Sequence, residues 1–275
     1  MIVDILQYEF MQNALLASLL ASIVCGLIGP FIVTKRIVSI SGGLSHTAFA
    51  GLGLAYWLGF NPLYGAALVV IAASLFISHN ENRNIDRSDL LIGMLWAAGV
   101  AAGILFISLT PGFIPDLMSF LFGNILTVPD SDLRIAFGLF LIVFISVMIF
   151  YKGFVAISLD EEYASTRHLP VRGLKTGLMV LIALSIVTLI QVVGIILVIA
   201  LLTIPVAVAS ELSMKFRTIM VLSIVVGIVS CASGLTFSYL FEIPSGAAII
   251  MTGILILILL KGSKRLLRFG RKLPG

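Results

Sequence analysis

Charged residues are scarce in this sequence. Only 11% of its 275 residues are Asp, Glu, Lys or Arg, whereas 60% are hydrophobic, and the mean hydropathy is +1.19. A water-soluble domain needs more polar surface than this composition supplies, which excludes a soluble fold. The sequence therefore predicts a protein that crosses the membrane several times.

Catalytic and nucleotide-binding motifs are also missing. The sequence contains no G-x-x-x-x-G-K-[ST] phosphate loop, no H-E-x-x-H and no G-x-S-x-G. Ser45 and His46 are adjacent, but neighbouring residues on a helix point about 100° apart, so they do not form a nucleophile and its base. Cys25 and Cys231 lie in apolar segments without CxxC spacing, which is typical of small core residues. We expect a protein that is not an enzyme and has no energy source of its own.

Nine apolar segments approach the length of about 20 residues that a helix needs to cross a bilayer. Their predicted ranges are 12–34, 41–59, 62–78, 89–110, 135–151, 174–192, 194–210, 218–241 and 245–261. The run 173–210 is too long for one crossing, so we divide it near Gln191 and Gly194; eight helices are the alternative. The predicted fold is an all-α transmembrane helix bundle, with residues 1–275 in a single transmembrane domain.

The basic residues follow this nine-helix arrangement. With the N-terminus outside and the C-terminus cytoplasmic, only Arg134 of the 17 Lys and Arg residues falls on the outer side. The outer side instead carries the acids Asp4, Glu9, Asp116, Asp130, Asp132 and Glu242. This acidic bias favours cations or a basic partner surface, and the alternative is that these residues are simply solvated.

Three connecting segments are informative. Residues 113–126 are apolar but short, which predicts an interfacial or re-entrant helix on the outer side. Residues 158–170 predict a short inner surface helix that Ser158 caps and that runs from acids to bases. In 204–217, Pro205 is expected to break an apolar helix before an amphipathic cytoplasmic turn that suits a soluble partner.

His46 is the only histidine inside an apolar segment of membrane length. An imidazole away from water is costly without a partner, so it predicts a pathway or a ligand site. The alternative is that His46 packs against another helix and bonds to a backbone carbonyl. Nearby, Gly42, Gly43, Gly51 and Gly53 predict a small-residue face that lets helices approach closely.

Five short segments occur in an order that resembles the membrane permeases of zinc, manganese and iron ABC importers. They are Ile28–Arg36, Gly42–Gly51, Asp116–Leu126, Leu202–Ala209 and Phe241–Gly246. The resemblance covers essentially the whole chain, and residues 155–217 are more distantly similar to permeases of cobalamin and siderophore importers. It implies a type II ABC importer permease in the cell (inner) membrane that imports a divalent transition metal: zinc, manganese or iron.

The resemblance also implies the partners and the roles of particular residues. The partners are a second copy of the chain, a cytoplasmic ABC ATPase dimer, an extracytoplasmic metal-binding protein and membrane lipid; neither nucleic acid nor a covalently bound cofactor is expected. The segment implied to couple to the ATPase comprises Ala207, Val208, Ala209, Ser210, Glu211 and Leu212.

For the metal path, the resemblance places His46 on the translocation route and Glu242 at its outer mouth. Asp116 and Glu242 would contact the binding protein. Many members of the family have an acidic residue four positions before the histidine, one helical turn away, whereas this chain has Gly42. The remaining alternative is a secondary metal transporter or channel that works without ATP.

Overall fold

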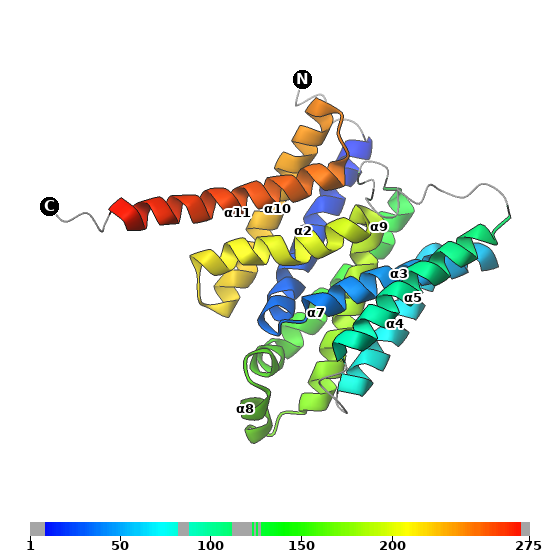
Figure 1. Ribbon diagram of the computed structural model, residues 1–275, viewed down its shortest axis with the longest axis horizontal. Helices are drawn as coiled ribbons and strands as arrows, with labels where there is room; N and C mark the ends of the chain where they lie inside the picture. The colour runs from blue at the N-terminus through cyan, green and yellow to red at the C-terminus, as the bar shows by residue number, and fades with distance from the viewer. Residues whose placement is uncertain (1–8, 82–87, 112–122, 124, 126–127, 271–275) are drawn as a thin grey trace.

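The computed structural model describes residues 9–81, 88–111, 123, 125 and 128–270, and the regular structure of this part of the chain is helical (Figure 1). In chain order the longer helices and one short helix are α2 (Glu9–Thr34), α3 (Val38–Leu58), α4 (Pro62–Glu81), α5 (Ser88–Ser108), α7 (Asp130–Leu159), α8 (Glu161–Thr166), α9 (Val171–Leu212), α10 (Phe216–Phe241) and α11 (Ser245–Gly270). The predicted all-α bundle is confirmed.

The number of membrane-crossing stretches is close to the prediction. Within the described residues, eight helical stretches are long and apolar enough to cross a membrane, against nine predicted segments. Each predicted segment coincides with a helix or with half of one. The predicted segment that is not among the eight is 41–59, which lies in α3; this helix has 21 residues but is rich in Gly and Ser and carries His46. Its polar composition, and not its length, sets it apart.

The long helix α9 contains both segments predicted from the run 173–210. Gly194, with φ 76° and ψ 166°, interrupts the helical backbone, and the two halves point in different directions (Figure 1). Only glycine adopts such angles readily, because any side chain would clash with its own backbone. The predicted division near Gly194 is therefore confirmed.

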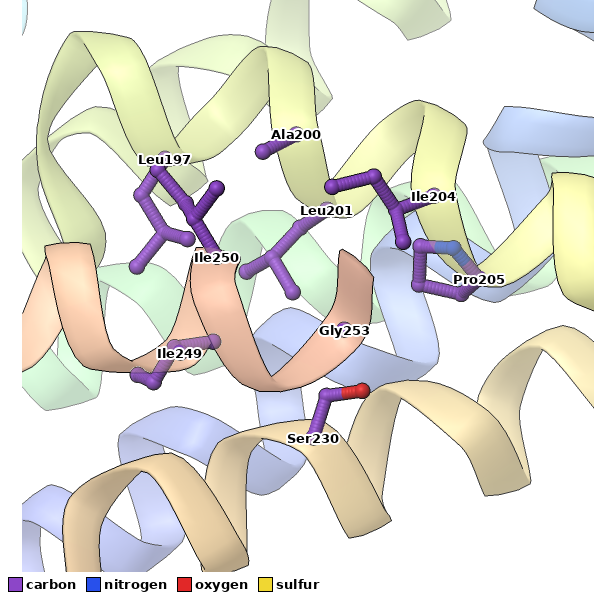
Figure 2. Close-up of a pocket in the computed structure, with 9 residues that line it drawn as sticks. All are labelled: Leu197, Ala200, Leu201, Ile204, Pro205, Ser230, Ile249, Ile250 and Gly253. Atoms are coloured by element: carbon purple, nitrogen blue, oxygen red, sulfur yellow. The ribbon is translucent and has the colours of Figure 1, made fainter. Parts of the chain in front are cut away.

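Pro205 does not end the helix, and the prediction of a break there was wrong. α9 continues through Pro205 to Leu212, because a proline removes only its own N–H donor while the flanking turns can keep their hydrogen bonds. Neighbouring helices support this stretch: Pro205, Ser230 of α10 and Gly253 of α11 line a common cavity of about 10 Å³ (Figure 2).

The centre of the bundle is built from α2 and the two halves of α9. In the most apolar stretch of α2, 78% of the residues are buried, and in each half of α9 the share is 61%. The corresponding shares are 22% in α5 and 17% in α7. α2 approaches its neighbours at two glycines: a Cβ at Gly26 would lie 2.7 Å from the Ile224 nitrogen, and one at Gly29 would lie 2.6 Å from the Leu202 carbonyl oxygen. Such contact gives the van der Waals packing that associates helices in lipid.

The predicted small-residue face holds α3 between α4 and α5. A Cβ at Gly51 would lie 2.3 Å from the carbonyl oxygen of Gly65 in α4, and a Cβ at Gly53 would lie 2.6 Å from that of Gly103 in α5. This prediction is confirmed. The helix that carries His46 is thus in backbone contact with a neighbour on each side.

The two cysteines are buried, free and part of the packed interior. Ser22 of α2 donates a hydrogen bond to the Sγ atom of Cys231 in α10, with 3.6 Å between the heavy atoms. The prediction that both cysteines are small core residues is confirmed.

Candidate functional site

His46 lies near the middle of α3 and is half-buried. Its ring stacks on that of Trp96 in α5, with 4.4 Å between the centroids and 17° between the planes. The Nδ1 atom is buried and has no hydrogen-bond partner among the described residues. His46 therefore packs against another helix, as the alternative prediction for this residue stated. Its Nδ1 atom, however, makes no hydrogen bond to a backbone carbonyl of the described residues.

The described part of the chain provides at most part of a metal site. Among the described residues, no three His, Cys, Asp or Glu side chains gather closely enough to hold a metal ion. A transition-metal dication takes roughly four to six ligands. His46 would therefore have to share an ion with water, with another chain or with residues outside the described part, and the described residues do not join it to Glu242 in a ready-made site.

Glu242 lies at the exposed turn between α10 and α11. It ends α10 in the left-handed conformation, with φ 54°, and its backbone N–H bonds to the Ser238 carbonyl. The Ser238 hydroxyl in turn donates to the carbonyl of Ile243 at 2.6 Å, which closes the turn. The carboxylate thus projects from a well-defined turn, and its role at the outer mouth stays a prediction.

Asp116 lies outside the described residues. So does the predicted interfacial segment 113–126, except for Gly123 and Ile125. Gly123 packs against the bend of α9, since a Cβ there would lie 2.3 Å from the carbonyl carbon of Val193. The docking role expected for Asp116 stays a prediction.

Residues 207–212, implied to couple to an ATPase, form the last turns of α9. Val208 and Ala209 are buried within the chain, whereas Ser210 is exposed and Leu212 is 49% exposed. Among the described residues, the most exposed apolar side chain is that of Met214, which is 95% exposed in the turn before α10. Met214 was not among the site residues predicted from the sequence; the signal was an apolar residue between Ser and Lys in a polar turn.

Glu211 is already bound within the chain. Its carboxylate lies 3.6 Å from the Nζ atoms of both Lys261 and Lys264, and Lys264 also donates to its backbone carbonyl. The C-terminal part of α11 thus contacts the end of α9 through these two lysines. Because all three side chains are partly exposed, the ion pairs contribute little energy and mainly fix geometry.

The predicted short surface helix is confirmed as α8, but its predicted cap was wrong. Asp160 caps the helix, and its carboxylate accepts a hydrogen bond of 3.0 Å from the backbone N–H of Tyr163. Ser158 instead lies in the last turn of α7. An aspartate two residues further along competes for the same role, and its charge adds a favourable interaction with the helix dipole.

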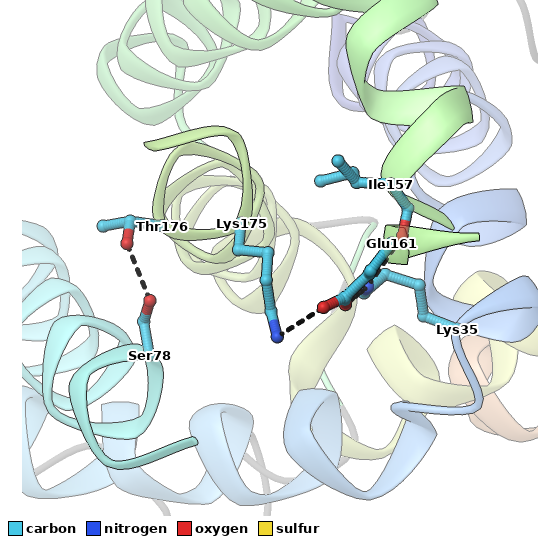
Figure 3. A network of polar contacts seen from close by, with 6 residues as sticks. All are labelled: Lys35, Ser78, Ile157, Glu161, Lys175 and Thr176. Carbon is cyan, nitrogen blue, oxygen red and sulfur yellow. Dashed lines mark hydrogen bonds and ion pairs between the residues drawn. The ribbon is translucent and has the colours of Figure 1, made fainter. Parts of the chain in front are cut away.

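An ion cluster joins three elements beside α8 (Figure 3). Glu161 of α8 accepts from Lys35, just after α2, at 2.6 Å and from Lys175 of α9 at 3.0 Å. Lys35 also donates to the Ile157 carbonyl of α7 at 3.1 Å. The side chains of Lys35 and Lys175 are only 9% and 15% exposed, so Glu161 compensates two largely buried charges. We call Lys35, Glu161 and Lys175 the Glu161 cluster.

Glu161→Gln is expected to destabilise the folded protein by about 1–2 kcal/mol at neutral pH. The change removes the carboxylate that Lys35 and Lys175 share. The expected loss is reduced because the Glu161 side chain is 40% exposed. Thermal unfolding of the purified protein measures the loss. Glu162→Gln is the matched control, because that side chain is exposed and makes no ion pair with a described residue; an equal loss in both variants would contradict the role of the cluster.

The difference in stability between the wild type and Glu161→Gln should depend on pH. Partial burial alone would raise the pKa of Glu161, but hydrogen bonds and charge from Lys35 and Lys175 outweigh it and lower the pKa below its ordinary value of 4.5. A lowered pKa in the folded state stabilises the protein above that ordinary value, and this stabilisation is lost as the pH falls through the folded-state pKa. The difference between wild type and Glu161→Gln should therefore be constant near neutrality and shrink as the pH falls below the ordinary value.

The fold and these placements define a multi-pass protein of the cell membrane with a histidine in a membrane-length helix and an exposed methionine, Met214, in the turn between α9 and α10. The chain matches the model of the ABC 3 transport family over residues 7–262 and belongs to that family. The resemblance to ABC importer permeases seen in the sequence is thereby confirmed.

Individual relatives agree with this assignment. The chain is 48% identical over 249 residues to an uncharacterized membrane protein of Synechocystis, covering 90% of this chain and 89% of that one. It is 37% identical over 270 residues to the manganese transport system membrane protein MntC of Listeria monocytogenes, and the match covers 98% of this chain and 96% of that protein. The solved structure of PsaBC from Streptococcus pneumoniae in complex with Fab aligns with a TM-score of 0.85 at 31% identity, covering 94% and 95%.

Proposed function

We propose that this chain is the permease subunit of an importer for a divalent transition metal, with Mn²⁺ as the first candidate and zinc and iron as the others. The observation that carries the proposal is His46, a half-buried histidine inside a membrane-length helix whose Nδ1 atom has no partner among the described residues. The name of the Listeria relative supports manganese. A single imidazole per chain also suits a path that must release its ion.

The proposed complex contains further subunits. The sequence has no phosphate loop, so ATP hydrolysis would occur on a separate pair of cytoplasmic ATPases. A second copy of the chain would supply further ligands, because His46 and Trp96 both keep exposed surface in the single chain. A metal-binding protein would deliver the ion at the turn that carries Glu242.

Uptake by reconstituted vesicles tests this function. Vesicles with the permease, its ATPase and the metal-binding protein should accumulate Mn²⁺ only when ATP is present on the ATPase side. Competition by Zn²⁺ and Fe²⁺ ranks the three metals. Vesicles with the permease alone should accumulate none. Accumulation that continues without the ATPase would contradict the proposal and favour a secondary transporter or channel.

Met214→Glu is expected to weaken ATPase binding at least about 10-fold, as truncation of a central interface anchor does. The variant should fold normally, because Met214 is 95% exposed and its side chain supports little of the interior. Co-purification with the ATPase measures binding, and thermal unfolding measures stability.

Met214→Leu is the control for this test, because it keeps an apolar side chain of similar size. It should bind the ATPase about as well as the wild type. Normal binding by Met214→Glu would exclude the α9–α10 turn as the ATPase contact.

A further inference from the structure

The indole of Trp96 covers the imidazole of His46. The two rings lie nearly parallel with 4.4 Å between their centroids. A metal-ligating histidine usually donates its second ring nitrogen to an acceptor that fixes the ring. Nδ1 of His46 has no such partner among the described residues. The contact that fixes the plane of this imidazole is therefore the stack on Trp96.

Backbone packing fixes this stack in place. One turn before Trp96, a Cβ at Gly43 would lie 2.8 Å from the Cγ2 atom of Ile92, and one turn after it a Cβ at Gly99 would lie 2.6 Å from the Cα atom of Thr47. Thr47 also donates its hydroxyl to the Leu95 carbonyl at 3.3 Å. Close contact on both sides of the ring pair therefore holds α3 and α5 in register where the two rings stack.

The same indole also covers the position one helical turn before His46. A Cβ at Gly42 would lie 2.9 Å from the Cζ3 atom of Trp96 and 3.3 Å from its Cη2 atom. Residues 42 and 46 are four apart and share one face of α3, so a side chain at 42 would be the nearest neighbour able to share an ion with the imidazole. The indole occupies that space, and it has no lone pair to offer a metal because its nitrogen is only a donor.

We propose that Trp96 is a positioning residue that keeps His46 a single, weak ligand for the transported metal ion. The indole holds the imidazole in one plane and excludes a second protein ligand from position 42. An ion bound by one imidazole of the chain is released readily, whereas two ligands on one face would retain it. This inference rests on the proposed function and assigns Trp96 a role in setting affinity along the path.

Transport kinetics of the complete complex test the inference. Trp96→Ala should raise KM for Mn²⁺ roughly 3- to 10-fold, the factor that an aromatic ring contact is worth, with little change in Vmax. Trp96→Phe keeps a ring and should stay near the wild-type KM. The double variant Gly42→Asp with Trp96→Ala should bind tighter, with KM at least about 10-fold below that of Trp96→Ala and a reduced Vmax, because release becomes slow.

A spectroscopic measurement separates this role from simple packing. The chain has two tryptophans, so Trp57→Phe leaves Trp96 as the only indole emitter. Mn²⁺ should quench this emission in the purified full-length chain, measured without the other subunits, and His46→Ala in the same background should abolish the quenching. Thermal unfolding accompanies each variant to show that it is folded.

Two results would overturn the role of Trp96 and leave the proposed function intact. One is that the wild-type complex transports Mn²⁺ but Mn²⁺ does not quench Trp96; the other is that Trp96→Ala loses Vmax and stability while its KM is unchanged. The proposed function fails separately, through absence of ATP-dependent metal uptake by the wild-type complex. In that case Mn²⁺ quenching that requires His46 would still support the ring pair as a metal contact, and its absence would overturn it.

Discussion

His46→Ala is expected to reduce Mn²⁺ uptake at limiting metal by roughly 10- to 100-fold. Loss of a residue that only hydrogen-bonds to a metal ligand already lowers metal affinity or activity by about this factor. The imidazole is the ionisable group that the structure places near the middle of α3, with a buried Nδ1 that has no described partner. Uptake of radioactive Mn²⁺ by vesicles containing the complete transporter gives the rate. At saturating metal the loss should be smaller, since a high concentration compensates for weak binding.

The matched control for this prediction is His79→Ala. His79 is exposed in the last turn of α4, and its loss should leave uptake unchanged. Thermal unfolding should show both variants folded. If His46→Ala transports limiting Mn²⁺ as fast as His79→Ala does, His46 is a packing residue and the metal path lies elsewhere.

The second large effect is expected for Gly194→Ala. Gly194 has φ 76° and ψ 166°, a region almost closed to residues with a Cβ, so alanine should cost about 1–3 kcal/mol of folding free energy. The change should also redirect the second half of α9, which ends at the proposed ATPase contact. We expect a lower unfolding temperature and loss of most ATP-driven uptake.

Gly93→Ala is the matched control for Gly194→Ala. A Cβ built at Gly93 in α5 meets nothing within 4 Å, so the same substitution there should be neutral or slightly stabilising. Equal stability and equal uptake in the two variants would show that the bend at Gly194 is not required.

Much of the fold was predictable because the bilayer imposes simple rules on the sequence. Apolar length located the helices, and a run too long for one crossing, with Gly194 near its middle, indicated the bend in α9. Two local predictions were wrong, the cap at Ser158 and the break at Pro205. Capping depends on which of several polar residues lies at the helix start, and a proline's effect depends on the helices packed beside it.

For the candidate site, the sequence by itself determined that a lone histidine lies within a membrane-length segment, that Gly42 stands where a second ligand would be expected, and that no phosphate loop is present. Only the tertiary structure decided what surrounds that histidine. Trp96 lies fifty positions further along the chain, and nothing in local spacing brings it onto His46 and Gly42. Backbone contact at glycines between α3 and α5 does so, because close approach of two helices sets which side chains meet between them.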